Sequence, residues 1–147
     1  MPQPDFKKAG KSMNTRRILV VDDSKTCCRM VEIVLRKCGF EQIECAQTAH
    51  AAFARLREQP FDIVISDWEM EPVSGIDLLH QVRRHPDTRG VAFILMSAKK
   101  EPHWVLEATR AGVDCLIAKP FDAETLKQKI AQVDSARERT KVREGVS

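Results

Sequence analysis

The sequence predicts an α/β fold, in which a doubly wound parallel sheet of five strands is covered by helices on both faces. Two observations lead to it: short runs of consecutive apolar residues alternate with longer amphipathic segments, and this pair repeats five times. Continuous apolar runs suit strands that are buried on both faces, and helical crossovers make neighbouring strands parallel. With 147 residues, 43% of them hydrophobic, the chain is expected to form one domain.

Each predicted element has its own local signal. Apolar runs that are too short for a helix mark the strands, and apolar residues at three- and four-residue spacing mark the helices. Gly39 and Gly112 follow two helical segments as stop signals, and Thr48 is predicted to cap the second helix. The predicted elements, in chain order, are strand 17–21, helix 24–38, strand 42–46, helix 48–58, strand 63–65, helix 74–84, strand 91–96, helix 102–111, strand 115–118 and helix 123–133.

The two ends of the chain differ in composition from its centre. Residues 1–15 contain prolines, a glycine and scattered lysines without an apolar period, and they predict a flexible basic arm. Residues 16–134 are predicted to form the globular domain, and residues 135–147 a C-terminal tail. The net charge of +3 comes from the ends, because residues 1–17 carry +4 and residues 134–147 carry +1. A slightly acidic centre argues against nucleic acid as a partner, although the basic tails leave that alternative open.

Composition also bounds the cellular setting. No apolar run approaches the roughly 18 residues of a membrane span, and the N-terminus lacks the apolar core of a signal peptide, so we expect a cytoplasmic protein without a membrane partner. The five cysteines are odd in number and form no Cys-x-x-Cys pair, which is typical of small buried hydrophobic residues in a reducing compartment.

Polar residues follow four of the five predicted strands. In a parallel sheet of this kind, the ligand site lies at the carboxyl ends of the strands. The residues delivered to that edge are Asp22, Asp23, Asp67, Ser97 and Lys119. Three converging carboxylates repel one another and call for a hard divalent cation, which predicts Mg²⁺. A carboxylate can also act as a nucleophile toward phosphorus, with Lys119 and Ser97 contacting the transferred phosphoryl group.

Each of these residues, taken alone, also has a purely structural explanation. Asp22 and Asp23 are typical of a helix N-terminus, Asp67 and Ser97 could cap the segments that follow them, and Lys119 could be a solvated charge. Their convergence at one edge of the sheet favours a functional site.

Four motifs, taken in order and with their spacing, resemble the response-regulator receiver domain, in particular its stand-alone, CheY-like chemotaxis type. The resemblance covers about residues 17–133. It implies a flavodoxin-like fold with strand order 2-1-3-4-5. The motifs are Val20-Val21-Asp22-Asp23, Ser66-Asp67-Trp68-Glu69-Met70, Met96-Ser97-Ala98 and Ala118-Lys119-Pro120-Phe121.

The resemblance assigns a role to each residue at this edge. It implies that Asp67 is the phosphoacceptor and that Mg²⁺ is bound by Asp23, Asp67 and the backbone carbonyl of Glu69, with Asp22 acting through water. Ser97 would be the switch hydroxyl and Lys119 the phosphoryl-contacting amine. The Lys119-Pro120 peptide bond is expected to be cis.

Two features depart from the family pattern. The family has an aromatic residue three positions before the lysine, where this chain has Leu116, so signal transmission must use another route. Glu69 and Lys99 occupy the positions that flank the phosphate in the family. We hypothesise that they pair across the pocket mouth, restrict the attacking water and lengthen the phosphorylated lifetime, although two exposed side chains that merely meet solvent are an equal alternative.

The resemblance implies a single-domain response regulator in a phosphorelay. The resemblance also leads us to expect that the protein is not an enzyme in its own right, beyond Mg²⁺-dependent self-phosphorylation and autodephosphorylation. A histidine kinase or a histidine phosphotransfer protein would donate the phosphoryl group to Asp67. Output would be phosphorylation-dependent binding of a downstream protein, through the face made by helix 102–111, strand 115–118 and helix 123–133, or relay of the phosphate.

Two other classes share parts of this pattern. A magnesium-dependent phosphatase has an aspartate nucleophile, but it places that residue after the first strand and usually needs a cap domain. A flavodoxin-like nucleotide binder requires a phosphate loop after the first strand, where Asp22 and Asp23 would repel the phosphate.

Overall fold

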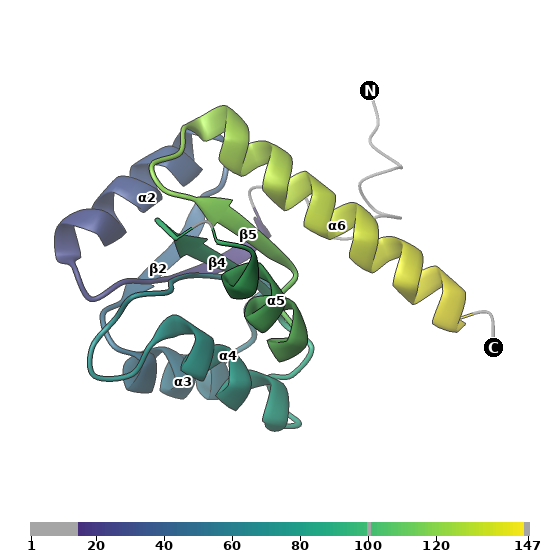
Figure 1. The fold of residues 1–147 in the computed structure, drawn as a ribbon. Helices are drawn as coiled ribbons and strands as arrows, with labels where there is room; N and C mark the ends of the chain where they lie inside the picture. Colours follow the sequence, from purple (N-terminus) through teal and green to yellow (C-terminus); the bar gives the residue numbers. More distant parts are fainter. Residues whose placement is uncertain (1–14, 100, 146–147) are drawn as a thin grey trace.

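The computed structural model describes residues 15–99 and 101–145 and confirms the predicted flavodoxin-like α/β fold (Figure 1). Five parallel strands lie in the order β2-β1-β3-β4-β5, and helices cover both faces of the sheet. The strands are β1 (Arg17–Val21), β2 (Gln42–Ala46), β3 (Ile63–Asp67), β4 (Ala92–Ser97) and β5 (Cys115–Ala118). The helices are α2 (Lys25–Lys37), α3 (Ala49–Glu58), α4 (Gly75–Arg84), α5 (Pro102–Ala111) and α6 (Ala123–Gly145).

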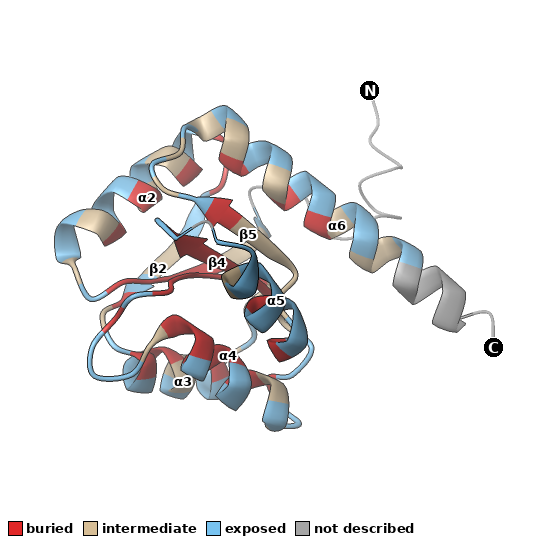
Figure 2. Cartoon of the chain, viewed as in Figure 1, coloured by how far each residue is buried: buried red, intermediate tan, exposed pale blue. Residues whose placement is uncertain are grey.

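The sheet separates two apolar cores. Alternate residues of a strand point to opposite faces, so Leu19 and Val21 of β1 join one core while Ile18 and Val20 join the other. The first core packs against α3, α4 and α5, and the second against α2 and α6. All residues of β3 and β4 are buried, which explains the apolar runs of these strands in the sequence, and Figure 2 shows β4 in red.

The predicted cap signals are present in the structure. The Thr48 hydroxyl accepts a hydrogen bond from the backbone N–H of Ala51 at 3.0 Å, so it caps α3 as predicted. Gly112 ends α5 in the left-handed conformation, with φ of 94°, which explains why glycine stands there. These local interactions set the ends of the helices that cover the sheet.

The last helix was predicted to end near Val133, and this boundary is wrong, because α6 continues to Gly145. Val133 is the last buried apolar residue of the helix, so the apolar period ends there. Residues 134–144 nevertheless contain neither glycine nor proline, and the helix continues through them.

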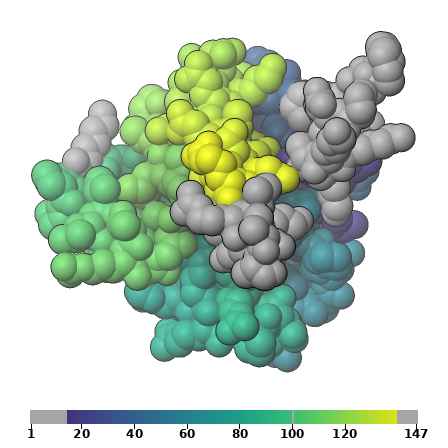
Figure 3. Space-filling model, turned by 90° about the vertical axis from the view of Figure 1, so that its right-hand side faces the viewer, coloured from purple at the N-terminus to yellow at the C-terminus, as the bar shows by residue number. Residues whose placement is uncertain are grey.

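Arg137 ties the extended part of α6 to the domain. Its guanidinium pairs with Asp114 at 2.8 Å and also donates to the carbonyl of Gly90. Figure 3 shows this part of α6 in yellow beside teal and green residues of the body. The division into arm, domain and tail stays a prediction, and the arm lies almost wholly outside the described residues.

The cysteines were predicted to be buried, and only some of them are. Cys28 and Cys38 are buried, and burial raises the pKa of the Cys28 thiol to about 12, which makes it a poor nucleophile. Cys45 is exposed, so the prediction of burial is wrong for it, because it lies on β2 at the edge of the sheet. Among the described helices, none combines the length and the apolar character that crossing a membrane requires.

Gly75, the first residue of α4, packs against the end of the central strand. Its backbone N–H donates to the carbonyl of Trp68 at 2.9 Å. A Cβ atom at this position would lie 2.1 Å from the carbonyl oxygen of Asp67 and 3.0 Å from the Leu95 side chain. The close approach of α4 to Asp67 therefore requires glycine.

We predict that Gly75→Ala destabilises the protein by about 1–3 kcal/mol, as overpacking of a filled site does. Urea unfolding monitored by circular dichroism measures this change. Gly90→Ala is the matched control, because a Cβ atom there meets nothing within 4 Å. Equal stabilities of the two variants would contradict the proposed constraint.

Candidate functional site

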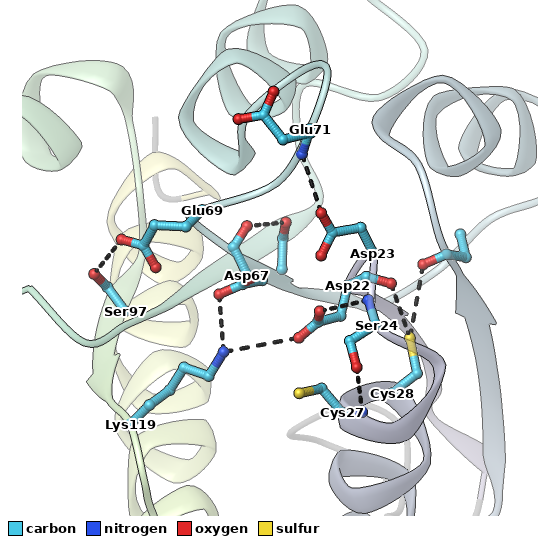
Figure 4. A network of polar contacts seen from close by, with 12 residues as sticks. Asp22, Asp23, Ser24, Cys27, Cys28, Asp67, Glu69, Glu71, Ser97 and Lys119 are labelled. Atoms are coloured by element: carbon cyan, nitrogen blue, oxygen red, sulfur yellow. Dashed lines mark hydrogen bonds and ion pairs between the residues drawn. The ribbon is translucent and has the colours of Figure 1, made fainter.

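The five predicted site residues come together at the carboxyl edge of the sheet (Figure 4). Asp22 and Asp23 follow β1, Asp67 ends β3, Ser97 ends β4 and Lys119 follows β5. Because β1, β3, β4 and β5 are parallel neighbours, their carboxyl ends lie side by side.

Three carboxylates form the acidic part of the site. Asp22, Asp23 and Asp67 each offer an oxygen atom, and these atoms lie within 4.8 Å of one another. Asp22 and Asp67 are 1% and 5% exposed, whereas Asp23 faces solvent. Charges this close and this buried repel strongly unless a cation lies among them.

The donor set fits a hard divalent cation. One Asp22 oxygen, Oδ1, accepts a hydrogen bond from the backbone N–H of Ser24 at 3.0 Å. The other, Oδ2, is buried and has no hydrogen-bond partner, and Lys119 approaches it only to 3.8 Å. An orphaned carboxylate oxygen beside two further carboxylates is what a bound Mg²⁺ would satisfy, here through a water molecule in its coordination shell.

Lys119 supplies the positive charge of the site. Its ammonium donates to Oδ1 of Asp67 at 3.0 Å, and its backbone N–H donates to the carbonyl of Ser97 at 3.0 Å. The second bond holds the Lys119 loop against the end of β4. The Lys119-Pro120 peptide bond is cis, as the resemblance implied.

The two partners shift each other's pKa. Burial raises the pKa of Asp67 above its ordinary value, although the hydrogen bond and charge of Lys119 pull it down. Burial lowers the pKa of Lys119, but its contacts with Asp67 and the charge of Asp22 outweigh burial and raise it. Lys119 is therefore held as a cation facing the carboxylates.

Ser97 and Glu69 contact each other at the mouth of the site. The Ser97 hydroxyl donates to the Glu69 carboxylate at 3.1 Å and accepts from the backbone N–H of Lys99 at 2.9 Å. Figure 4 shows the two side-chain bonds next to each other: the Ser97 hydroxyl donates to Glu69, and the Lys119 ammonium donates to Asp67.

The hypothesised pairing of Glu69 with Lys99 is wrong for this structure. Within the described residues, the Lys99 ammonium lies over the ring of Trp104, 4.7 Å from its centroid, and the Glu69 carboxylate accepts from Ser97. The first turn of α5 brings an aromatic ring to Lys99, and the sequence spacing of Glu69 and Lys99 could not show this competitor.

Trp104 is the residue that the sequence analysis missed. Its ring meets the ring of Trp68 edge to face, with centroids 5.4 Å apart and planes at 86°. Leu116 of β5, the position without an aromatic, is half-buried against the same core that Trp68 joins and Trp104 contacts. The sequence did contain a signal for a role of Trp104 near the site. Trp104 is one of only two tryptophans in the chain, and only a short loop separates it from Ser97.

Proteins of similar sequence show to which family the chain belongs. A family model described as the response regulator receiver domain matches residues 18–131. Chemotaxis protein CheY-3 of Vibrio cholerae is 36% identical over 117 residues, which cover 80% of this chain and 90% of that protein. Chemotaxis protein CheY of Pseudomonas aeruginosa is 34% identical, covering 80% of this chain and 94% of the relative.

Solved structures agree with the sequence relatives. Chemotaxis response regulator CheY4 of Vibrio cholerae superposes with a TM-score of 0.74 at 27% identity, over 80% of this chain and 98% of that structure. A putative response regulator from Chloroflexus aurantiacus superposes with a TM-score of 0.76 at 26% identity, over 82% and 98%. Motifs, site geometry and fold thus agree, and the chain belongs to the response regulator receiver domain family, with CheY chemotaxis proteins among its relatives.

Proposed function

We propose that this protein accepts a phosphoryl group on Asp67 from a histidine kinase or a histidine phosphotransfer protein, and signals in its phosphorylated state. The observation that carries the proposal is the surroundings of the Asp67 carboxylate, which accepts a hydrogen bond from the Lys119 ammonium at 3.0 Å and has an oxygen within 4.8 Å of oxygens of Asp22 and Asp23. Family membership supports the reaction class.

The proposed transfer uses groups that already face one another. A carboxylate oxygen of Asp67 attacks the phosphorus atom, the bond between phosphorus and the donor imidazole breaks, and the imidazole leaves as the free base and takes up a proton. Lys119 neutralises charge on the transferred group, and the Ser97 hydroxyl exchanges its bond to Glu69 for one to a phosphoryl oxygen.

We assign the metal ligands in the same site. Asp23, Asp67 and the backbone carbonyl of Glu69 would hold Mg²⁺, and Asp22 would act through water. When bound, the ion supplies positive charge that offsets the carboxylates and the incoming phosphoryl group. The backbone N–H of Glu71 donates to the Asp23 carboxylate at 3.1 Å, so this ligand is already oriented toward the site.

The proposed output face consists of α5, β5 and α6. Val105 and Leu106 of α5 are 46% and 50% exposed, and large apolar side chains left in solvent are typical of a docking surface. We propose that a downstream protein binds there in a phosphorylation-dependent manner, with relay of the phosphate as the second route.

Incubation with phosphoramidate and Mg²⁺ is expected to add one phosphoryl group to the protein, and Asp67→Asn is expected to abolish the addition, because an amide is not a nucleophile toward phosphorus. Intact-mass spectrometry measures the product. Asp62→Asn is the control, since Asp62 lies directly before β3, at the end of the strand opposite Asp67. A phosphorylated Asp67→Asn variant would refute the assignment.

Mg²⁺ is expected to change the tryptophan fluorescence, because Trp68 directly follows Asp67 and is 4% exposed. Asp23→Asn should weaken Mg²⁺ binding at least about tenfold. Loss of a residue that only hydrogen-bonds to a metal ligand already lowers metal affinity by about this factor, and Asp23 is proposed to be a ligand itself. Titration of fluorescence against Mg²⁺, with reversal by a chelator, gives both affinities. Equal affinities would exclude Asp23 as a ligand.

Glu69 and Lys99 remain candidates for setting the phosphorylated lifetime, now as separate side chains at the pocket mouth. Removing either one opens the approach of water to phosphorus, so Glu69→Ala and Lys99→Ala should each speed dephosphorylation severalfold. Decay of the phosphorylated form after donor removal measures this rate. Glu71→Ala controls for the loss of an exposed carboxylate from the same loop, and unchanged rates in both test variants would disprove the role.

A further inference from the structure

The ring of Trp104 contacts two segments that lead directly to the site. One is the loop after β4, through the Lys99 ammonium at 4.7 Å from the ring centroid. The other is the residue after Asp67, through the edge-to-face contact with Trp68 at 5.4 Å. A single side chain on α5 thus contacts both Trp68, which follows Asp67, and Lys99, which lies two residues after Ser97.

The Lys99 side chain has two alternative partners. It is exposed and lies over an aromatic face, which is a weak contact for an amine that solvent can reach. Its backbone N–H is bonded to the Ser97 hydroxyl at 2.9 Å, so the residue starts from the edge of the site. A phosphoryl group on Asp67 would bring a charge of about −1.5 to −2, and a charge-assisted hydrogen bond to it is the stronger partner for the ammonium.

The first turn of α5 is suited to move in response. Its N-cap residue, Glu101, makes no side-chain capping bond, and residues 101–103 are exposed. The other end of the helix is anchored by the buried Ala108 and Ala111. A change at Trp104 can therefore shift the N-terminal turn while the C-terminal half stays packed.

We propose that Trp104 is a positioning residue that couples the site to the outer face of α5. It holds Lys99 over its ring while Asp67 is unmodified, and it loses this contact when Lys99 turns toward the phosphoryl group. The indole then repacks against Trp68 and moves the turn that precedes the exposed Val105 and Leu106. This inference rests on the proposed phosphorylation of Asp67 and adds the route by which it reaches the output face.

Fluorine NMR of the full chain labelled with 5-fluorotryptophan tests the coupling, because the chain has two tryptophans and therefore two resonances. Trp104→Phe assigns them. Phosphoramidate with Mg²⁺ should shift the Trp104 resonance. Lys99→Met should shift it before the donor is added and should reduce the donor-induced shift to less than half.

Two further variants separate the contact from general effects. Lys99→Arg should restore the donor-induced shift, because a guanidinium also stacks on an indole face. Lys127→Met removes an exposed lysine from α6, near Cys38 in the opposite core, and should leave both resonances unchanged.

Intact-mass measurement on every sample distinguishes a failure of the coupling from a failure of phosphorylation. If the phosphoryl group is attached and the Trp104 resonance does not move, or moves equally in Lys99→Met, the coupling through Trp104 is overturned and the proposed function stands. If no phosphoryl group is attached to the wild-type chain, the proposed function fails and the coupling fails with it.

Discussion

Electrostatic repulsion among the carboxylates of Asp22, Asp23 and Asp67 is the constraint on which the arrangement of the site depends. Two of the three are buried, where water cannot screen them. Lys119 offsets part of the repulsion through its bond to Asp67, but it leaves one oxygen of Asp22 without a hydrogen bond. The carboxylates of the site are therefore only partly neutralised, and a divalent cation would supply the remaining positive charge.

The parallel sheet holds these charges together against their repulsion. β1 and β3 are hydrogen-bonded neighbours inside the sheet, and every residue of the two strands except Arg17 is buried. The close packing of Gly75 against the Asp67 carbonyl and the bond from Lys119 to the end of β4 brace the same edge. Hydrophobic burial of the strands thus supplies the free energy that keeps like charges close.

The loops beyond the strand ends make contacts of a different kind. The Ser97 hydroxyl donates to Glu69, and the Lys99 ammonium lies over Trp104, so in this structure neither group contacts Asp67 among the interactions of the described residues. These contacts are exposed or partly exposed and individually weak. Groups held weakly near a strongly charged site can change partners when its charge changes, and the proposed coupling from Asp67 to α5 relies on this property.

The sequence by itself determined the five β–α units, the strand order implied by family resemblance, and the identity of the residues at the carboxyl edge. This was possible because apolar periodicity is local and because parallel strands place their ends at one edge. Only the tertiary structure decided that Lys99 faces Trp104 instead of Glu69, that Cys45 is exposed on an edge strand, and that α6 extends to contact Asp114. The contact of α6 with Asp114 joins segments distant in sequence, and the exposure of Cys45 follows from which strand lies at the edge. Lys99 and Trp104 are only five residues apart, but whether Lys99 contacts Trp104 or Glu69 depends on how the first turn of α5 lies against the end of β3.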